Sequence, residues 1–323
     1  MIEPTDSADS RPPDAHRISP LKSVLSQILT RAQNEDGGWG YRHGLSSRTE
    51  ATSWVLLAMS KQEEGSREGT CVQRGRDWLL RAQLKDGSWS AQPGQTEGCW
   101  QTSLACLALL VHGAPSGAVK SGIRWLCDFS PAEHSLWWNV QRRILGKDKH
   151  VRQNEFLKGW SWTRGTASWV EPTSLALIAL QGCPPEVLPS QAARRIRFGE
   201  ALLYDRECPD GGWNCGNPLV YGVPGEPQVG PSVWALLALR KYFGRLGNQT
   251  GIRWLESRYP HLRSPSSLAL AYLCLQQYGR EISLPTTALA SLLERDELLG
   301  DSLVLAWSLL GLKGGAEWLL PQR

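Results

Sequence analysis

The sequence lacks several features that define large protein classes. No apolar run approaches the ~20 residues that a membrane-spanning helix needs. No dense run of Lys or Arg stands out, and the net charge is only +4 on 35 basic and 31 acidic residues, so nothing indicates a nucleic-acid interface. With 41% hydrophobic and 20% charged residues, the composition predicts an ordinary globular protein that does not bind nucleic acid.

Metal-binding spacings are missing as well. The 8 cysteines are scattered, several of them within apolar runs, and no Cys-x-x-Cys or His-x-x-x-His motif accompanies them. No signal peptide precedes them. We therefore expect reduced thiols, a cytoplasmic protein, and no metal ion or cofactor.

Tryptophan, in contrast, is abundant, because the 16 Trp outnumber the 7 Tyr and 4 Phe together. Several tryptophans end copies of a repeat. The most complete copy is RGRDWLLRAQLKDGSW, residues 74–89, in which Gly75 is followed by Gln83, Gly87 and Trp89.

Two less complete copies of this pattern indicate a repetitive architecture. One runs from Gly199 to Trp213 with Glu207 in place of the glutamine, and the other keeps only the second half, which ends at Trp39. Such repeats stack one structural unit on the next, so we expect these tryptophans to wedge between neighbouring units. The Asp-Gly-Gly-Trp segment at Asp36 suits a sharp turn.

Two kinds of helical segment alternate along the chain. The first kind is apolar on nearly all faces, which predicts burial on all sides. These segments are residues 51–59, 102–111, 172–180, 231–239, 265–275 and 301–312. The second kind is amphipathic and is expected to be half-exposed. These segments are residues 21–33, 72–83, 117–127, 191–204, 248–258 and 286–295.

This alternation predicts an all-α fold, an α6/α6 barrel in which inner helices are wrapped by outer helices. If the inner helices run parallel, their first residues converge on one mouth. Residues 1–18, rich in Pro, Asp and Ser, are expected to form a disordered leader, and residues 19–323 a single barrel domain. Long connections such as 129–168 and 205–230 are usually functional lids or disordered, and the second is expected to form an ordered wall of the cavity.

The repeat of residues 74–89 resembles the QW repeat of squalene-hopene and oxidosqualene cyclases. On this motif the chain is identified as a member of the terpenoid cyclase and protein prenyltransferase β-subunit superfamily, over about residues 20–320. The resemblance implies an α6/α6 barrel around an apolar cavity, and the chain is long enough for one barrel.

The resemblance also points to acids at the inner helix starts. Cyclases of this family that protonate a polyprene use Asp-x-Asp-Asp-Thr there, with the central Asp as the proton donor. The corresponding residues 169–173, WVEPT, carry Glu171 at the central position and Thr173 at the Thr position, and residues 48–52, RTEAT, place Glu50 similarly. Both glutamates are candidate acids, and both could instead oppose the helix dipole from the first turn.

The prenyltransferase branch of the superfamily holds zinc with Asp, Cys and His at inner helix starts. Cys99 and Asp301 occupy such positions here, but no His does, so we expect no zinc. An N-cap is the alternative role for Asp301.

Several residues at the inner helix starts are candidates for the wall of a substrate pocket. They are Trp100, Gln101, Trp169, Thr173, Trp234 and Asp301. Indole rings can stabilise carbocations through their π faces. Core filling is the alternative role for the three tryptophans.

These features predict an isoprenoid-processing enzyme that folds a polyprenyl chain in an apolar barrel cavity and starts cyclisation with Glu171 or Glu50. The expected partner is a hydrophobic isoprenoid, taken up through peripheral contact with a membrane. One alternative is a non-catalytic barrel that binds a lipid or a partner. The other is a polysaccharide hydrolase or lyase that uses Glu50 and Glu171 as paired carboxylates.

Overall fold

The structure, a computed structural model, is mostly helical, as the sequence predicts. It describes residues 15–60, 66–113, 117–134, 153–154 and 156–314. Residues 1–14 of the expected leader, Trp137 and Trp138 of the first long connection, and Gly315 lie outside the described residues. The second long connection carries a short hairpin, β1 (Leu219–Val220) and β2 (Val223–Pro224).

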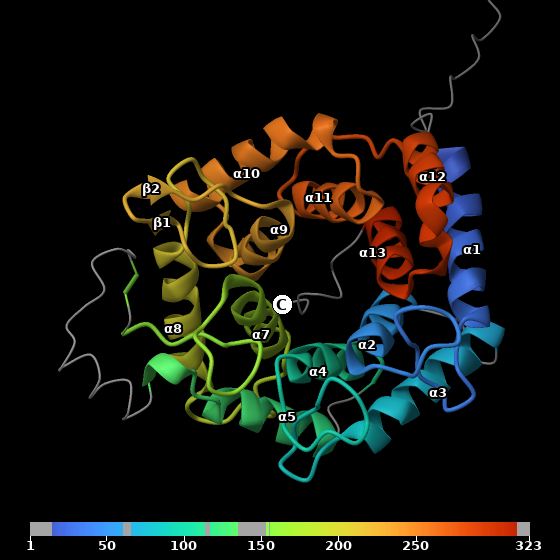
Figure 1. Ribbon diagram of the computed structural model, residues 1–323, viewed down its shortest axis with the longest axis horizontal. Helices are drawn as coiled ribbons and strands as arrows, with labels where there is room; N and C mark the ends of the chain where they lie inside the picture. The colour runs from blue at the N-terminus through green and yellow to red at the C-terminus, as the bar shows by residue number, and fades with distance from the viewer. Residues whose placement is uncertain (1–14, 61–65, 114–116, 135–152, 155, 315–323) are drawn as a thin grey trace, which may run out of the picture.

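Six helices with almost completely buried side chains form a closed ring at the centre (Figure 1). Each contacts the next along the chain, and the last contacts the first. They are α2 (Thr49–Ala58), α4 (Gln101–Val111), α7 (Val170–Gln181), α9 (Val229–Ala238), α11 (Pro265–Gln277) and α13 (Ser302–Lys313). Their sequences have no polar face, and burial on all sides follows from that.

Amphipathic helices surround this ring (Figure 1). They are α1 (Ala15–Arg31), α3 (Arg67–Ala82), α5 (Gly117–Asp128), α8 (Ala192–Asp205), α10 (Leu246–Arg258) and α12 (Thr286–Glu294). The predicted helix ends agree to within a few residues, and the largest difference is at α1. This helix begins at Ala15, so residues 15–18 of the expected leader are helical instead.

Trp89 joins three helices through its backbone and its ring. It is fully buried, and its indole N–H donates to the carbonyl of Leu79 in α3 at 2.7 Å. Its backbone N–H donates to the Thr102 hydroxyl of α4 at 3.0 Å, and the same hydroxyl donates back to the Trp89 carbonyl at 3.3 Å. Gly122 of α5 leaves room for the ring, because a Cβ there would lie 2.8 Å from Trp89 Cζ3.

The same joint recurs at Trp39, Trp160 and Trp213, which with Trp89 we call the joint tryptophans. Each indole N–H donates to a backbone carbonyl of a preceding outer helix, and each backbone N–H donates to a hydroxyl of an inner helix. The sequence repeat did not reveal the copy at Trp160, because Asn154 and Lys158 occupy the positions of its Gln and Gly. Arg195 of α8 lies beside this joint. Its guanidinium donates to two backbone carbonyls and lies 3.8 Å from the Trp160 ring centroid.

The aspartates of the turn segments have a structural role that the sequence did not reveal. Asp36 accepts the indole N–H of Trp78 at 2.9 Å, and Asp86 accepts that of Trp125 at 3.1 Å. These hydrogen bonds help to hold the pKa of both carboxyls below the ordinary value, although burial acts in the opposite direction. The turn itself is confirmed by the positive φ of +94° at Gly37.

Backbone hydrogen bonds tie the start of one inner helix to the loop before the next. In each, the N–H at a helix start donates to the carbonyl of the residue two positions after a joint tryptophan. The pairs are Ser302 to Tyr41, Thr49 to Ala91, Trp100 to Trp162, and Val170 to Cys215, at 2.9, 3.2, 3.3 and 3.0 Å. The first residues of α13, α2, α4 and α7 therefore lie at one end of the ring, which we call the mouth.

Within the described residues, no helix is both long enough and apolar enough to cross a membrane.

Gly75 offers a test of the joint. A Cβ at this position in α3 would lie 2.5 Å from Trp39 Cζ3. Gly75→Ala should therefore lower the free energy of unfolding by about 1–3 kcal/mol, since overpacking outweighs the gain in helix propensity. The control is Gly244→Ala, where nothing lies within 4 Å of the added atom. Urea unfolding followed by tryptophan fluorescence measures both, and equal effects would contradict the assignment.

Candidate active site at the mouth

Acidic side chains from separate helices gather at the mouth. Glu50 lies in the first turn of α2, Glu171 in the first turn of α7, and Asp301 directly before α13. The charges of Asp301 and Glu50 interact, and so do those of Glu50 and Glu171. The structure therefore brings together both acids that the sequence predicted.

Glu50 is mostly buried, and its carboxylate accepts a hydrogen bond from the Tyr41 hydroxyl at 2.7 Å. Burial raises the pKa of Glu50, and the nearby charge of Asp301 raises it further. The Tyr41 hydrogen bond acts in the opposite direction because it stabilises the ionised form. Of the two glutamates, Glu50 is therefore the one whose carboxylate accepts a hydrogen bond in the described part of the chain.

Tyr41 is a residue of this site that the sequence analysis missed. Its carbonyl accepts the N–H of Ser302, and the Arg48 guanidinium lies 6.0 Å from its ring centroid. Burial and the neighbouring Glu50 raise the pKa of its hydroxyl, so Tyr41 keeps its proton at neutral pH and donates a hydrogen bond to Glu50. The repeat could have identified Tyr41, because it follows the joint tryptophan Trp39 by two residues.

Glu171 has a different environment from Glu50. Burial raises the pKa of Glu171, and the charge of Glu50 adds to the increase. The backbone of Gly230 in α9 approaches its carboxyl, since a Cβ there would lie 3.4 Å from Oε1. The charge of Glu171 also contributes to raising the pKa of the Cys215 thiol. Within the described residues, no hydrogen bond to its carboxyl is present.

Asp301 acts as the N-cap of α13, which confirms the alternative role given to it. Its Oδ1 accepts the backbone N–H groups of Leu303 at 2.9 Å and Val304 at 3.1 Å. Its carboxyl also faces Glu50, as the charge interaction shows.

Trp100 and Gln101 lie at the start of α4 and line a cavity of about 470 Å³. The Trp100 ring meets Trp162 edge to face, with centroids 4.9 Å apart. The Gln101 Oε1 accepts a hydrogen bond from the Cys99 thiol at 2.6 Å. Arg164 lies on the same cavity wall and approaches Asp86 at 3.6 Å.

Trp169 and Thr173 both form hydrogen bonds to the backbone of the joint tryptophan Trp160. Trp169 precedes α7 and is partly exposed, and its backbone N–H donates to the Trp160 carbonyl at 3.0 Å. Thr173 is fully buried, and its hydroxyl binds the Trp160 backbone N–H at 3.0 Å. Thr173 therefore belongs to a joint.

Trp234 lies deeper in the ring, and only 4% of its surface is exposed. It stacks on Trp54 of α2, with ring centroids 5.0 Å apart and 30° between the planes. Trp307 of α13 meets Trp54 edge to face at 5.9 Å. We call these three residues the indole layer; the sequence analysis did not anticipate its other two members.

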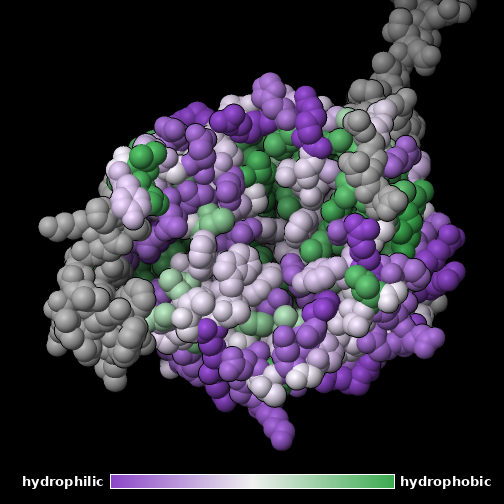
Figure 2. Space-filling model, in the orientation of Figure 1, coloured by the Kyte–Doolittle hydropathy of each residue, from purple (hydrophilic) through white to green (hydrophobic). Residues whose placement is uncertain are grey.

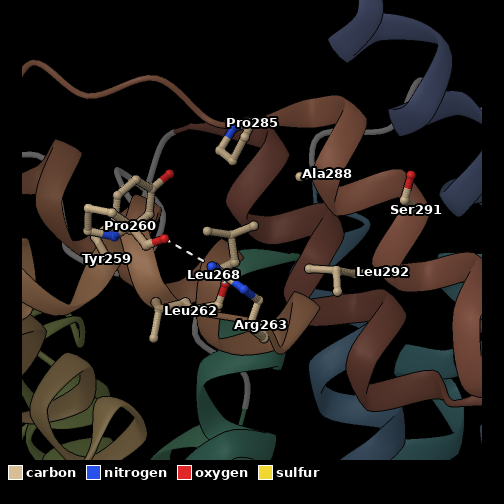
Figure 3. Close-up of a pocket in the computed structure, with 9 residues that line it drawn as sticks. All are labelled: Tyr259, Pro260, Leu262, Arg263, Leu268, Pro285, Ala288, Ser291 and Leu292. Atoms are coloured by element: carbon tan, nitrogen blue, oxygen red, sulfur yellow. Dashed lines mark hydrogen bonds between the residues drawn. The ribbon is translucent and has the colours of Figure 1, made fainter.

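A second cavity, of about 410 Å³, lies outside the ring between the end of α10 and helices α11 and α12 (Figure 3). It is mostly apolar, with Leu268 and Leu292 among its lining residues, and Arg263 on one side. None of the predicted site residues contributes to it.

No protein-family model matches this sequence. A stretch of 85 residues is 34% identical to the drimenyl diphosphate synthase of Streptantibioticus cattleyicolor and covers 26% of this chain and 15% of that protein. A match of 252 residues to the terpene cyclase-glycosyl transferase fusion protein of Humicola fuscoatra is 24% identical and covers 72% of this chain and 18% of that protein. The chain thus matches only a minor part of the length of these relatives.

Among solved structures, the chain is similar to the type II terpene cyclase MstE from Scytonema in complex with its product, merosterolic acid A. The TM-score is 0.61 at 13% identity, and the alignment covers 95% of this chain and 99% of that chain. At this identity the likeness establishes the fold: the chain shares the helical architecture of type II terpene cyclases.

The raised pKa of Glu171 predicts how the free energy of unfolding depends on pH. The folded protein holds this proton more tightly than the unfolded chain, so the free energy of unfolding falls as pH rises from about 4.5 through the folded pKa. Glu171→Gln removes this penalty. The variant should be more stable than the wild type at neutral pH, and the difference should shrink as pH falls towards 4.5.

Urea unfolding across this pH range measures the difference. The matched control is Glu281→Gln, which changes an exposed carboxyl on the surface. A Glu171→Gln variant that is less stable than the wild type at neutral pH would contradict the placement of an uncompensated acid at the mouth.

Proposed function

We propose that the protein is an isoprenoid-processing enzyme of the terpene cyclase type, in which one α6/α6 barrel, formed within residues 19–323, folds a polyprenyl chain for acid-initiated cyclisation. The closed ring of apolar helices supports this assignment, as does the shared fold. The matched relatives are named for terpene cyclisation, and an MstE complex contains geranylgeranyl dihydroxybenzoate as substrate.

The observation that carries the proposal is the environment of Glu171. A general acid must hold a proton at the working pH and must reach the substrate with it. Burial and the negative charge of Glu50 both favour the protonated form of Glu171. Tyr41 meanwhile stabilises the ionised form of Glu50. The pKa of Glu50 is also raised, but Glu50 is engaged by the Tyr41 hydroxyl, whereas Glu171 is not. We therefore assign Glu171 as the proton donor and Glu50 as the group that carries negative charge when it is ionised.

The reaction starts with proton transfer from the Glu171 carboxyl to the end of the chain. On an alkene, the proton forms a C–H bond and leaves a carbocation. On an epoxide, it forms a hydroxyl group as the C–O bond breaks. The π electrons of the next double bond then form a C–C bond to the cation. The last cation loses a proton to water, and the Glu171 carboxylate takes up a proton from water, so the product is an isomer of the substrate and no co-reactant is needed.

Two features of the mouth stabilise positive charge on the chain. The carboxylate of Glu50 provides a negative charge in a partly buried position, where screening by water is weak. Trp169, Trp100 and Trp162 lie nearby, each in a loop or helix start at the mouth, and the π face of an indole attracts a cation. The sequence predicted the first two of these tryptophans, and the structure adds Trp162.

The reaction can be tested with linear polyprenes, their diphosphates and their epoxides, and soluble polysaccharides serve as the negative control. We expect a cyclised isomer, and Glu171→Gln should lower its rate of formation by about 10²–10⁴-fold, the usual contribution of a general acid. Glu281→Gln should leave the rate unchanged. Product formation is followed by gas chromatography and mass spectrometry.

Unchanged turnover in Glu171→Gln would remove this residue from the mechanism. An isoprenoid that co-purifies intact and is never converted would instead favour the non-catalytic lipid-binding barrel. Cleavage of a polysaccharide would favour the polysaccharide hydrolase or lyase and contradict the proposal.

Exposed apolar side chains at the mouth support the uptake of substrate by peripheral contact with a membrane. Leu45, Tyr221 and Val223 are 53%, 73% and 65% exposed, and each lies in a loop that precedes an inner helix. Figure 2, which views the molecule as in Figure 1, shows a hydrophobic patch over the β1–β2 hairpin. The same view shows apolar atoms in a recess inside the ring.

Flotation with phosphatidylcholine vesicles tests this contact. Replacing Tyr221 and Val223 together by Ser should lower the fraction of protein that floats, because it removes exposed apolar area. The control is Leu246→Ser, which changes a residue that is 74% exposed at the start of α10, away from the mouth. An equal fall in both variants, or none, would contradict the proposed surface.

A further inference from the structure

The members of the indole layer lie at a common depth in the ring. Trp54, Trp234 and Trp307 are each five residues after the first residue of their helices α2, α9 and α13. At the rise of an α-helix, that places them about 7.5 Å below the mouth. Glu50 and Glu171, in the first turns, lie on the mouth side of this layer.

The layer crosses the ring instead of lining one side of it. In the cycle of helix contacts, α2 and α9 are separated by two helices in either direction, so they face each other across the axis. Trp54 and Trp234 nevertheless stack at 5.0 Å. Trp307 extends the layer from the neighbouring helix α13. The rings of opposite helices therefore meet in the middle of the interior.

The layer is also tightly packed. Trp54 and Trp234 are 1% and 4% exposed, and both belong to the core cluster. Protein interiors are close-packed, and a large ring held between opposite helices has little freedom to move aside. An aromatic pair at this separation adds stability beyond the area that it buries. The stacked rings consequently close the interior of the ring at this depth, while the helices themselves continue further.

We propose that the indole layer is the end wall of the substrate chamber and restricts the enzyme to short isoprenoid chains, such as farnesyl and geranylgeranyl chains, while excluding triterpene-length chains such as squalene. This inference rests on the proposed function for the nature of the ligand. The chamber consists of the mouth half of the ring, with the acids near its entrance and the stacked indoles at its base. A longer chain meets the rings of Trp54 and Trp234 before its reactive end reaches Glu171.

Equilibrium binding of farnesol, geranylgeraniol and squalene to the full chain tests the wall independently of turnover. The measurement uses radiolabelled ligands and rapid separation of bound from free. The wild type should retain the two alcohols and bind squalene at least about 10-fold more weakly. Trp234→Leu opens the wall and should reduce that difference about 10-fold or more, as expected when a pocket gains room for further carbon atoms.

The control is Trp254→Leu, the same change on outer helix α10, which should leave the ratio of affinities unchanged. Trp234→Phe keeps an aromatic ring, and it should give a smaller shift if Trp234→Leu fails to fold by circular dichroism. Squalene binding to the wild type as tightly as farnesol would overturn the inference, and so would an unchanged ratio in a folded variant at Trp234.

The outcomes separate this inference from the proposed reaction. A shifted ratio of affinities without turnover of any ligand would support the indole layer as the end wall and contradict the proposed cyclase reaction. Turnover of a short chain, with the same preference for chain length in the Trp234 variant, would support the cyclase reaction and contradict the end wall.

Discussion

A single hydroxyl group at each joint controls the geometry of the mouth. Thr102 accepts the backbone N–H of Trp89 and donates to its carbonyl, so one side chain satisfies both polar groups of a buried residue. Without this partner, burying that backbone would cost free energy. The loop is thereby fixed to the inner helix, and the residue two positions further is held at the mouth. Its carbonyl then receives the N–H that starts the neighbouring inner helix.

The acids at the mouth depend on this arrangement. Tyr41 reaches Glu50 because its loop is held at both ends, by the Trp39 joint and by the hydrogen bond from Ser302. Glu171 lies in the first turn of α7, where the helix dipole favours ionisation. Burial and the charge of Glu50 oppose it and prevail, since the pKa of Glu171 is raised. Carboxyls whose pKa is shifted by burial and by a neighbouring like charge occur preferentially at functional sites.

The sequence predicted the helices well because their signals are local. Apolar runs without a polar face identified the inner helices, and the repeat identified three of the four joint tryptophans. Trp160 was missed because Asn154 and Lys158 replace the Gln and Gly of the repeat, and Arg195 from a distant segment donates to the backbone there instead. The stacking of Trp54 on Trp234 was beyond prediction for another reason. It depends on which face each helix turns to the axis, and an all-apolar helix carries no periodic signal for that.

The raised pKa of Glu171 has a chemical consequence for the choice of substrate. A carboxyl that keeps its proton more firmly is a weaker acid, and protonation of an isolated alkene demands a strong one. An epoxide oxygen carries lone pairs and accepts a proton more readily than a carbon–carbon double bond. For the reaction that we propose, the environment that raises the pKa of Glu171 therefore favours an epoxide over the corresponding alkene. In that reaction an alkene would depend more strongly on negative charge at Glu50, which would stabilise the carbocation as it forms.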